Sequence, residues 1–154
     1  MALKIGTFFI ENGSSSSDSK GNIKSGEAYF GKEGNDKISS NAFGTLYHQG
    51  SYWLIPSILS GGPGNDTYNV GNNDFSIIYD AASSTSDVLN ISANFSRADR
   101  FYTIDNRHLF LGISYNNTSV LIADGMNNKG AIEKISFNDM TFNGSPASIS
   151  TLVD

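Results

Sequence analysis

The feature that most constrains the fold of this chain is the nine-residue segment Gly61–Asn69. It carries glycine at its first, second and fourth positions, Asp66 at its sixth and Tyr68 at its eighth. Glycine adopts positive φ angles without steric cost, so the first half of the segment can turn sharply and expose carbonyl oxygens. Asp66 adds a carboxylate beside them, and Tyr68 opens a short strand that faces a core. Clustered oxygen ligands of this kind suit Ca²⁺.

A less complete copy of the segment occupies Gly31–Ser39, where Lys32 replaces the second glycine. Because Ca²⁺ takes about six to eight oxygen ligands, one nonapeptide cannot complete a site, whereas two stacked turns can. We therefore expect Asp36 and Asp66 to share an ion, and Asp80 or Asp87 to close a second, terminal site. The predicted metal ligands are Gly31, Gly34, Asp36, Gly61, Gly62, Gly64, Asp66, Asp80 and Asp87.

The two nonapeptides resemble the calcium-binding repeats of the RTX, or haemolysin-type, proteins. The resemblance implies a short right-handed parallel β-roll with Ca²⁺ between stacked turns, and the late segment Ile132–Asp139 looks like the region that caps the roll in this family. It further implies a secreted bacterial module that folds in extracellular calcium and leaves by type I secretion. The tail Ser145–Asp154 is compatible with an uncleaved secretion signal.

The rest of the chain predicts an all-β fold in one domain. Clusters of β-branched and aromatic residues alternate with Gly, Asn, Ser and Asp, and no window keeps a helical apolar period. The 154 residues suffice for a single core. We expect an N-terminal cap over 1–30, a β-roll over 31–87 and an antiparallel β cap over 88–154. The predicted strands are Leu3–Ile10, Ala28–Phe30, Lys37–Ser39, Tyr68–Val70, Phe75–Tyr79, Val88–Ile91, Phe101–Ile104, Leu109–Tyr115, Ser119–Ala123 and Ile132–Phe137.

The spacing of the two aspartates suggests an inserted hairpin. Nine-residue half-turns stack every 18 residues, whereas Asp36 and Asp66 are 30 apart, an excess of 12. The segment Thr45–Pro56 has this length and could leave the roll as a hairpin with Gln49-Gly50 at its tip. Three half-turns with three extra residues would instead place the aspartates on opposite edges. The sequence leaves both arrangements open.

The serine-rich run Gly13–Gly21 also has two interpretations. Its composition is typical of a loop. Counted back in steps of nine from Gly31, however, Asp18 falls at the aspartate position, with Asn22–Phe30 as the segment between. The run is therefore either a loop or an eroded repeat.

Three aromatic residues of the predicted hairpin, Tyr47, Tyr52 and Trp53, have two candidate roles. They could form a stacking platform for a cell-surface or extracellular glycan, which would make the chain an adhesin-like module with structural calcium. Alternatively, Trp53 folds back onto the core, and we favour this role because a lone tryptophan in a small β-domain is more often buried.

Several functions find little support in the sequence. The net charge is −5, and Arg97, Arg100 and Arg107 are interleaved with acids, so we expect no nucleic-acid partner. Cysteine is absent, which excludes disulfides and thiolate metal sites. No apolar run is long enough for a membrane span, and no N-terminal signal peptide is evident, so we expect export by another route.

We also expect no enzymatic activity. The chain has no nucleophile elbow, phosphate-binding loop or zinc-protease motif. Its two histidines, His48 and His108, are sixty residues apart and fall on different predicted strands. Each is better explained as a structural residue than as a catalytic base.

Overall fold

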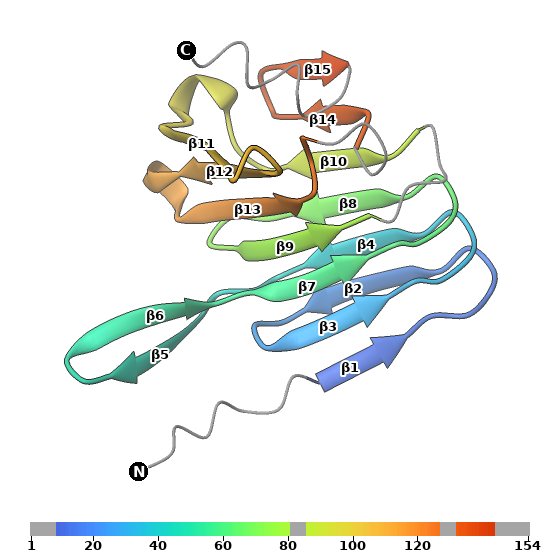
Figure 1. The fold of residues 1–154 in the computed structure, drawn as a ribbon, viewed down its shortest axis with the longest axis horizontal. Helices are drawn as coiled ribbons and strands as arrows, with labels where there is room; N and C mark the ends of the chain where they lie inside the picture. Colours follow the sequence, from blue (N-terminus) through green and yellow to red (C-terminus); the bar gives the residue numbers. More distant parts are fainter. Residues whose placement is uncertain (1–8, 81–85, 127–131, 144–154) are drawn as a thin grey trace.

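The computed structural model describes residues 9–80, 86–126 and 132–143, and strands and turns dominate these residues (Figure 1). The all-β prediction is confirmed. The described helical segments are two 3-10 turns, η1 (Phe95–Arg97) and η2 (Ser114–Asn116). No described helix has the length and apolar character needed to cross a membrane. The predicted strand at Leu3–Ile10 lies mostly outside the described residues, as does the tail Ser145–Asp154.

The described strands form two larger sheets and one hairpin. The seven-stranded sheet contains, in spatial order, β1 (Phe9–Asn12), β3 (Glu27–Phe30), β7 (Ser57–Ser60), β9 (Phe75–Tyr79), β13 (Thr118–Ala123), β12 (His108–Ile113) and β11 (Arg100–Ile104). The six-stranded sheet contains β15 (Thr141–Asn143), β14 (Lys134–Ser136), β10 (Val88–Ile91), β8 (Thr67–Val70), β4 (Lys37–Ser40) and β2 (Ser19–Ile23). The hairpin pairs β5 (Gly44–His48) with β6 (Ser51–Ile55).

From β1 to β10, leaving the hairpin aside, successive strands alternate between the two sheets (Figure 1). Each strand pairs in parallel with the strand one turn earlier. Ser19 of β2 lies opposite Lys37 of β4, an offset of 18 residues. Lys37 lies opposite Thr67 of β8, an offset of 30. The starts of the strands in the six-stranded sheet therefore align along one edge, whatever the chain length between them.

The hairpin accounts for the longer offset. Gln49 (φ 48°) and Gly50 (φ 80°) form its tip, as predicted. Figure 1 shows β5 and β6 projecting away from the two sheets. Since Asp36 and Asp66 directly precede β4 and β8, which pair in register, they lie on the same edge. The arrangement with the aspartates on opposite edges is excluded.

Antiparallel strands complete the later part of both sheets. β11, β12 and β13 form an antiparallel unit that joins β9 through a parallel contact, and β14 pairs with β10 on one side and β15 on the other. Asn117 adopts a left-handed conformation in the turn before β13, which asparagine tolerates better than most residues.

Two predicted boundaries need correction. Within 1–30, the described residues already form β1, β2 and β3 of the stacked sheets, so this region is not a separate cap. At the other end, β10 still pairs in parallel with β8, so the parallel stack extends past residue 87. Backbone pairing to a neighbouring strand needs no glycine motif, which is why the stack is longer than the nonapeptides.

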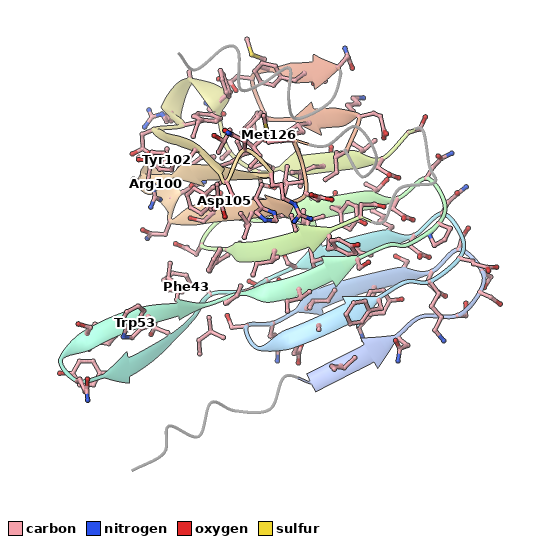
Figure 2. All side chains as sticks on the ribbon, in the orientation of Figure 1. Phe43, Trp53, Arg100, Tyr102, Asp105 and Met126 are labelled. Atoms are coloured by element: carbon pink, nitrogen blue, oxygen red, sulfur yellow. The ribbon has the colours of Figure 1, made fainter. Side chains whose placement is uncertain are left out.

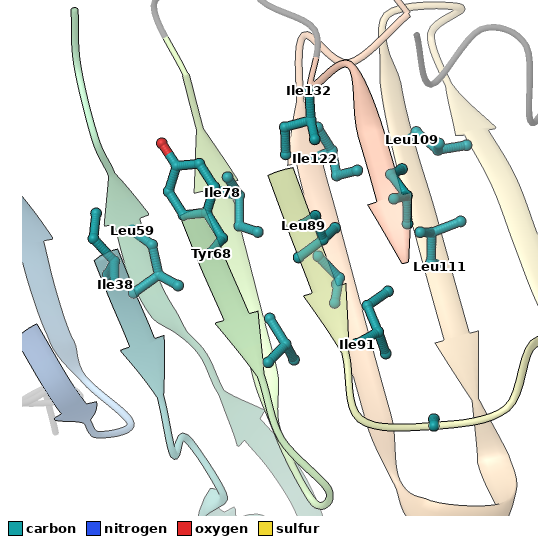
Figure 3. Packing of buried hydrophobic residues seen from close by; sticks show 14 of the residues in the cluster. Ile38, Leu59, Tyr68, Ile78, Leu89, Ile91, Leu109, Leu111, Ile122 and Ile132 are labelled. Carbon is teal, nitrogen blue, oxygen red and sulfur yellow. The ribbon is translucent and has the colours of Figure 1, made fainter. Parts of the chain in front are cut away.

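The core lies between the two larger sheets. Alternate residues of each strand point inward, as in β8, where Tyr68 and Val70 are buried and their neighbours are not. Figure 3 shows Ile38, Tyr68 and Leu89 of one sheet facing the core beside Leu59 and Ile78 of the other. This apolar layer fixes the strand register, and with it the alignment of the turns.

Candidate metal centre

Carboxylates stand at the start of every stacked strand of the six-stranded sheet. The first four are Asp18, Asp36, Asp66 and Asp87, and Glu133 takes the same place before β14. Each backbone N–H donates to a carboxylate oxygen of the next turn. The bonds run from Asp18 to Asp36, from Asp36 to Asp66, from Asp66 to Asp87 and from Asp87 to Glu133, each 2.7 Å long. This carboxylate ladder occupies one edge of the molecule.

The ladder hydrogen bonds engage Oδ1 of Asp36 and Oδ1 of Asp66 but not the second oxygen of either side chain. Oδ2 of Asp36 and Oδ2 of Asp66 are buried and have no hydrogen-bond partner. A Cβ atom placed on Gly31 would overlap Oδ2 of Asp36 and lie 2.7 Å from the carbonyl oxygen of Gly61. A Cβ on Gly61 would likewise overlap Oδ2 of Asp66. The first glycine of each nonapeptide is thus required because the carboxylate of its own turn fills the space of a side chain.

Asp80 takes the place of that glycine in the last stacked turn. Leu59 pairs with Ile78, so two residues further on Gly61 corresponds to Asp80. The substitution brings a third carboxylate to Asp66 and Asp87. Oxygens of these three side chains lie within 4.8 Å of one another, and all three residues are buried.

Tyr68 connects this group to the core. Its hydroxyl donates to Oδ2 of Asp80 at 2.7 Å and accepts the backbone N–H of Gly61 at 2.7 Å. Oδ1 of Asp80 is buried and has no partner. Tyr68 therefore satisfies one oxygen of Asp80 and fixes the direction of the other.

The electrostatics of the group favour any species that brings positive charge. Burial raises the pKa of Asp66 to about 6, and the charges of Asp87 and Asp36 add to the rise against the backbone hydrogen bond from Asp36. Burial is also the main cause of the raised pKa of Asp80, to which Asp87 and Asp66 contribute while the hydrogen bond from Tyr68 opposes. Burial likewise raises the pKa of Asp36. Either protons or a cation must relieve this repulsion.

The remaining predicted glycine ligands, Gly34, Gly62 and Gly64, have φ angles of 128°, 93° and 143°. A Cβ on Gly62 would overlap the carbonyl oxygen of Lys32, and one on Gly64 would overlap that of Gly34. The role that the structure gives these glycines is close stacking of one turn on the next. The carboxylates gather instead around Gly31 and Gly61.

The first turn confirms that Asp18 occupies the aspartate position, but its carboxylate is already satisfied. Oδ2 of Asp18 accepts the backbone N–H of Ser14 at 2.6 Å and the hydroxyl of Ser14 at 3.0 Å. The serine-rich run is therefore a stacked turn that supplies its own donors. Ser14, four residues before Asp18, is the sequence signal for this closure. Glu133 ends the ladder directly before β14 and was not among the site residues predicted from the sequence.

The hairpin aromatics are exposed. The exposed fractions are 61% for Tyr47, 75% for Tyr52 and 62% for Trp53, so the prediction that Trp53 folds into the core is wrong (Figure 2). The hairpin leaves the sheets, and Trp53 lies outside the buried cluster between them. Tyr47 pairs with Tyr52, ring centroids 4.8 Å apart, whereas Trp53 pairs with Leu46. Since adjacent residues of a strand face opposite ways, the tyrosines share one face and Trp53 lies on the other.

Neither the protein-family models nor the curated proteins include a match for this chain. The donor set itself indicates the chemistry of the edge. Carboxylate and carbonyl oxygens are ligands for hard cations. Nδ1 of His108 accepts the backbone N–H of Asp124, so this histidine has a structural hydrogen bond away from the carboxylate ladder.

Proposed function

We propose that this chain is a calcium-binding module whose folding is driven by Ca²⁺. The observation that carries the proposal is the buried group of Asp66, Asp80 and Asp87, whose oxygens lie within 4.8 Å of one another. Two of its members, Asp66 and Asp80, have a buried oxygen without a partner. A buried carboxylate oxygen without a partner is costly, and a divalent cation bound to the oxygens of Asp66 and Asp80 would remove that cost.

A second site is proposed between the nonapeptide turns. Oδ2 of Asp36 and the carbonyl oxygen of Gly61 converge on the space beside Gly31. Mixed carboxylate and carbonyl ligands with irregular geometry suit Ca²⁺, whereas Mg²⁺ demands a near-ideal octahedron and sheds its waters reluctantly. The donor set also lacks the imidazole and thiolate ligands that zinc sites prefer.

The same residues would couple the metal to folding. Without a cation, the carboxylates repel one another and the glycine-rich turns are costly to order. An ion present at ten to a hundred times its dissociation constant would contribute about 1.4–2.7 kcal/mol to the folded state. With the affinity of about 10⁻⁴–10⁻³ M typical of extracellular modules, the sites would fill outside the cell. We accordingly propose a non-catalytic, secreted module of the RTX type.

The test is calorimetric titration with Ca²⁺ and Mg²⁺, combined with thermal unfolding. We expect binding of Ca²⁺ and a higher melting temperature at millimolar Ca²⁺, with a much smaller effect of Mg²⁺. Asp80→Asn should remove the terminal ion, whereas the matched control Asp105→Asn, an exposed residue in the turn after β11, should bind as the wild type does. Equal stability with and without Ca²⁺ would refute the proposal.

The exposed hairpin favours a second candidate function, binding of a glycan to the paired faces of Tyr47 and Tyr52. Tyr47 and Tyr52 form a cross-strand pair whose rings are more than half exposed to solvent, as a stacking surface for a sugar requires. Tyr52→Ala should then abolish retention on immobilised glycans and leave the melting temperature unchanged. A glycan array without hits would remove this candidate.

A further inference from the structure

A polar cleft of about 300 Å³ lies at the end of the molecule opposite the carboxylate ladder. The ladder residues precede strands of the six-stranded sheet, whereas the cleft is formed where β8, β10 and β14 end, together with the turn from β12 to β13. Its lining is Asn72, Ser92, Ala93, Asn94, Arg97, Ile113, Tyr115, Asn116 and Asn138. The size is at the lower end of the range for small-molecule sites, about 300–1,000 Å³.

The lining combines a small apolar floor with neutral polar walls. Ala93 and Ile113 are buried, and the lining contains four asparagines but no carboxylate. Two carboxylates close in sequence to lining residues, Asp139 and Asp99, accept backbone N–H groups of Phe95 and Ser114. The chain has a net charge of −5, yet no acidic side chain lines this cleft, so a negatively charged ligand would meet no carboxylate in its lining.

Arg97 supplies the cleft with a positioned cation. Its guanidinium lies over the ring of Tyr115, 4.3 Å from the ring centroid. This contact is a cation–π interaction, and the guanidinium carries five N–H donors in a planar fork that can also bind a ligand. Among the described residues, no carboxylate forms an ion pair with Arg97. A planar fork of donors held in this way matches a carboxylate of a ligand.

The asparagines retain hydrogen-bonding capacity. Asn116 donates to Oδ1 of Asn72 at 2.8 Å, but Oδ1 of Asn116 is buried and has no partner. The side-chain amides of Asn94 and Asn138 make no hydrogen bond within the described part of the chain. Amides provide a donor and an acceptor side by side, which suits hydroxyl groups that both donate and accept.

We propose that this cleft binds a hexuronate residue, the carboxylate on Arg97 and the hydroxyls on the asparagine amides. The carboxylate accounts for the unpaired guanidinium, the hydroxyls for the amides and for the buried acceptor of Asn116, and the ring carbons for the floor of Ala93 and Ile113. The site is separate from the carboxylate ladder and from the aromatic hairpin, so it does not rest on the calcium proposal.

The test is an NMR titration of the protein, at fixed free Ca²⁺, with glucuronate, glucose and acetate. We expect chemical-shift changes at Tyr115 and Ile113 with glucuronate. Glucose, which lacks the carboxylate, and acetate, which lacks the hydroxyls, should each bind at least about tenfold more weakly. Trigalacturonate distinguishes the source of the ligand. Tighter binding than the monosaccharide indicates a hexuronate within a polysaccharide chain, and equal binding indicates the free sugar.

Four variants assign the site. Arg97→Gln should weaken glucuronate binding about tenfold or more, and Asn138→Asp should do so through repulsion. Arg107→Gln removes the same charge from an ion pair with Asp124, and Trp53→Ala removes the hairpin tryptophan; both should bind as the wild type does. Equal loss in Arg97→Gln and Arg107→Gln, binding of acetate as tight as that of glucuronate, or no shift at any concentration would overturn the proposal.

Discussion

The two ends of the six-stranded sheet both bury aspartates, but they differ in how many hydrogen-bond donors the carboxylate oxygens receive. Asp66, where β8 begins, and Asp74, in the loop after β8, are both fully buried. Both oxygens of Asp74 are satisfied: Oδ1 accepts the N–H of Ala42 at 3.2 Å and the hydroxyl of Ser76 at 2.9 Å, and Oδ2 accepts from Ser40 and Gly71. Oδ2 of Asp66, by contrast, has no partner.

Burial of an acid therefore does not by itself identify a metal site. The Asp74 end is a closed network of hydroxyls and backbone N–H groups, in which Ser76 also bonds to Ser40 and Ser57. Such a network is complete without an ion. At the ladder end, backbone N–H groups satisfy one oxygen of Asp36 and one of Asp66, and the second oxygen of each has no hydrogen-bond partner. The two ends differ in the number of hydrogen-bond donors that each buried aspartate receives. Substitutions at the two ends should therefore change stability differently when Ca²⁺ is added.

The largest expected effect is at Asp74. Asp74→Ala would leave two backbone N–H groups and two serine hydroxyls without their acceptor, so the free energy of unfolding should fall by roughly 3–5 kcal/mol. The loss should be the same with and without Ca²⁺, because no ion is involved. Urea unfolding in both conditions measures this. A loss that appears only with Ca²⁺ would place a cation at this end and end the contrast.

A smaller loss of stability, which depends on Ca²⁺, is expected for substitution of Asp66. Asp66→Asn removes a buried charge that burial and the charges of Asp87 and Asp36 disfavour more than the hydrogen bond from Asp36 favours it, so metal-free stability should stay the same or rise. With Ca²⁺ at a hundred times its dissociation constant, the variant should be about 2.7 kcal/mol less stable than the wild type because it lacks the ion. Calorimetric stoichiometry together with urea unfolding gives both quantities. Destabilisation of the metal-free form would show that the carboxylate is already satisfied.

The pH dependence should also reverse with the metal. The pKa of Asp66 is raised from 3.8 to about 6 on folding. The stabilisation that protonation brings is thus fully present below pH 3.8 and is lost as the pH rises through about 6. The metal-free protein should gain roughly 2 kcal/mol on going from about pH 7.5 to about pH 4.5. The calcium-loaded protein should lose stability over this interval because protons compete with Ca²⁺ for the carboxylates. Melting curves at both pH values, with and without Ca²⁺, test this, and the same change in both forms would contradict Asp66 as a Ca²⁺ ligand.

The smallest expected effect compares the two nonapeptide turns. Lys32 has φ 79°, whereas the equivalent residue in the second copy is Gly62, at φ 93°. Lys32→Gly should stabilise the protein by about 1 kcal/mol through relief of this strain, partly offset by the greater freedom of glycine in the unfolded chain. Thermal unfolding should show a slightly higher melting temperature, and Lys24→Gly serves as a control at an exposed residue. A lower melting temperature would mean that the lysine side chain itself stabilises the turn.

The sequence was sufficient to predict the repeated parts of this fold. The spacing between Asp36 and Asp66 indicated an inserted hairpin, because stacked turns require a fixed register, but it left open whether the two aspartates share an edge. The pairing of β4 with β8 decides this. It was not sufficient for β2, whose residues Ser19–Ile23 show no apolar alternation and are held by pairing with β4. β7 was missed because Pro56 and the short run after it gave no strand pattern in isolation.

The candidate site was predicted in part. Asp36, Asp66, Asp80 and Asp87 were named from their spacing, but the closeness of Asp80 depends on a cross-sheet register that places it opposite Gly61. The burial of Trp53 was predicted wrongly because frequency favours a buried tryptophan, whereas the inserted hairpin has no sheet to pack on. The register between strands and the direction in which the hairpin projects depend on the three-dimensional fold, so they cannot be predicted from local composition.

The contacts of Tyr68 give the protein an optical probe of its own. The ring is buried in the core beside Leu59 and Ile78 (Figure 3), and its hydroxyl donates to Asp80. The near-ultraviolet absorption and emission of a phenol depend on whether its hydroxyl faces a free carboxylate or one bound to a cation. A change at the ladder would therefore appear in the tyrosine spectrum, while the single tryptophan, Trp53, on the distant hairpin provides an internal reference. Occupancy can be followed in the unlabelled protein.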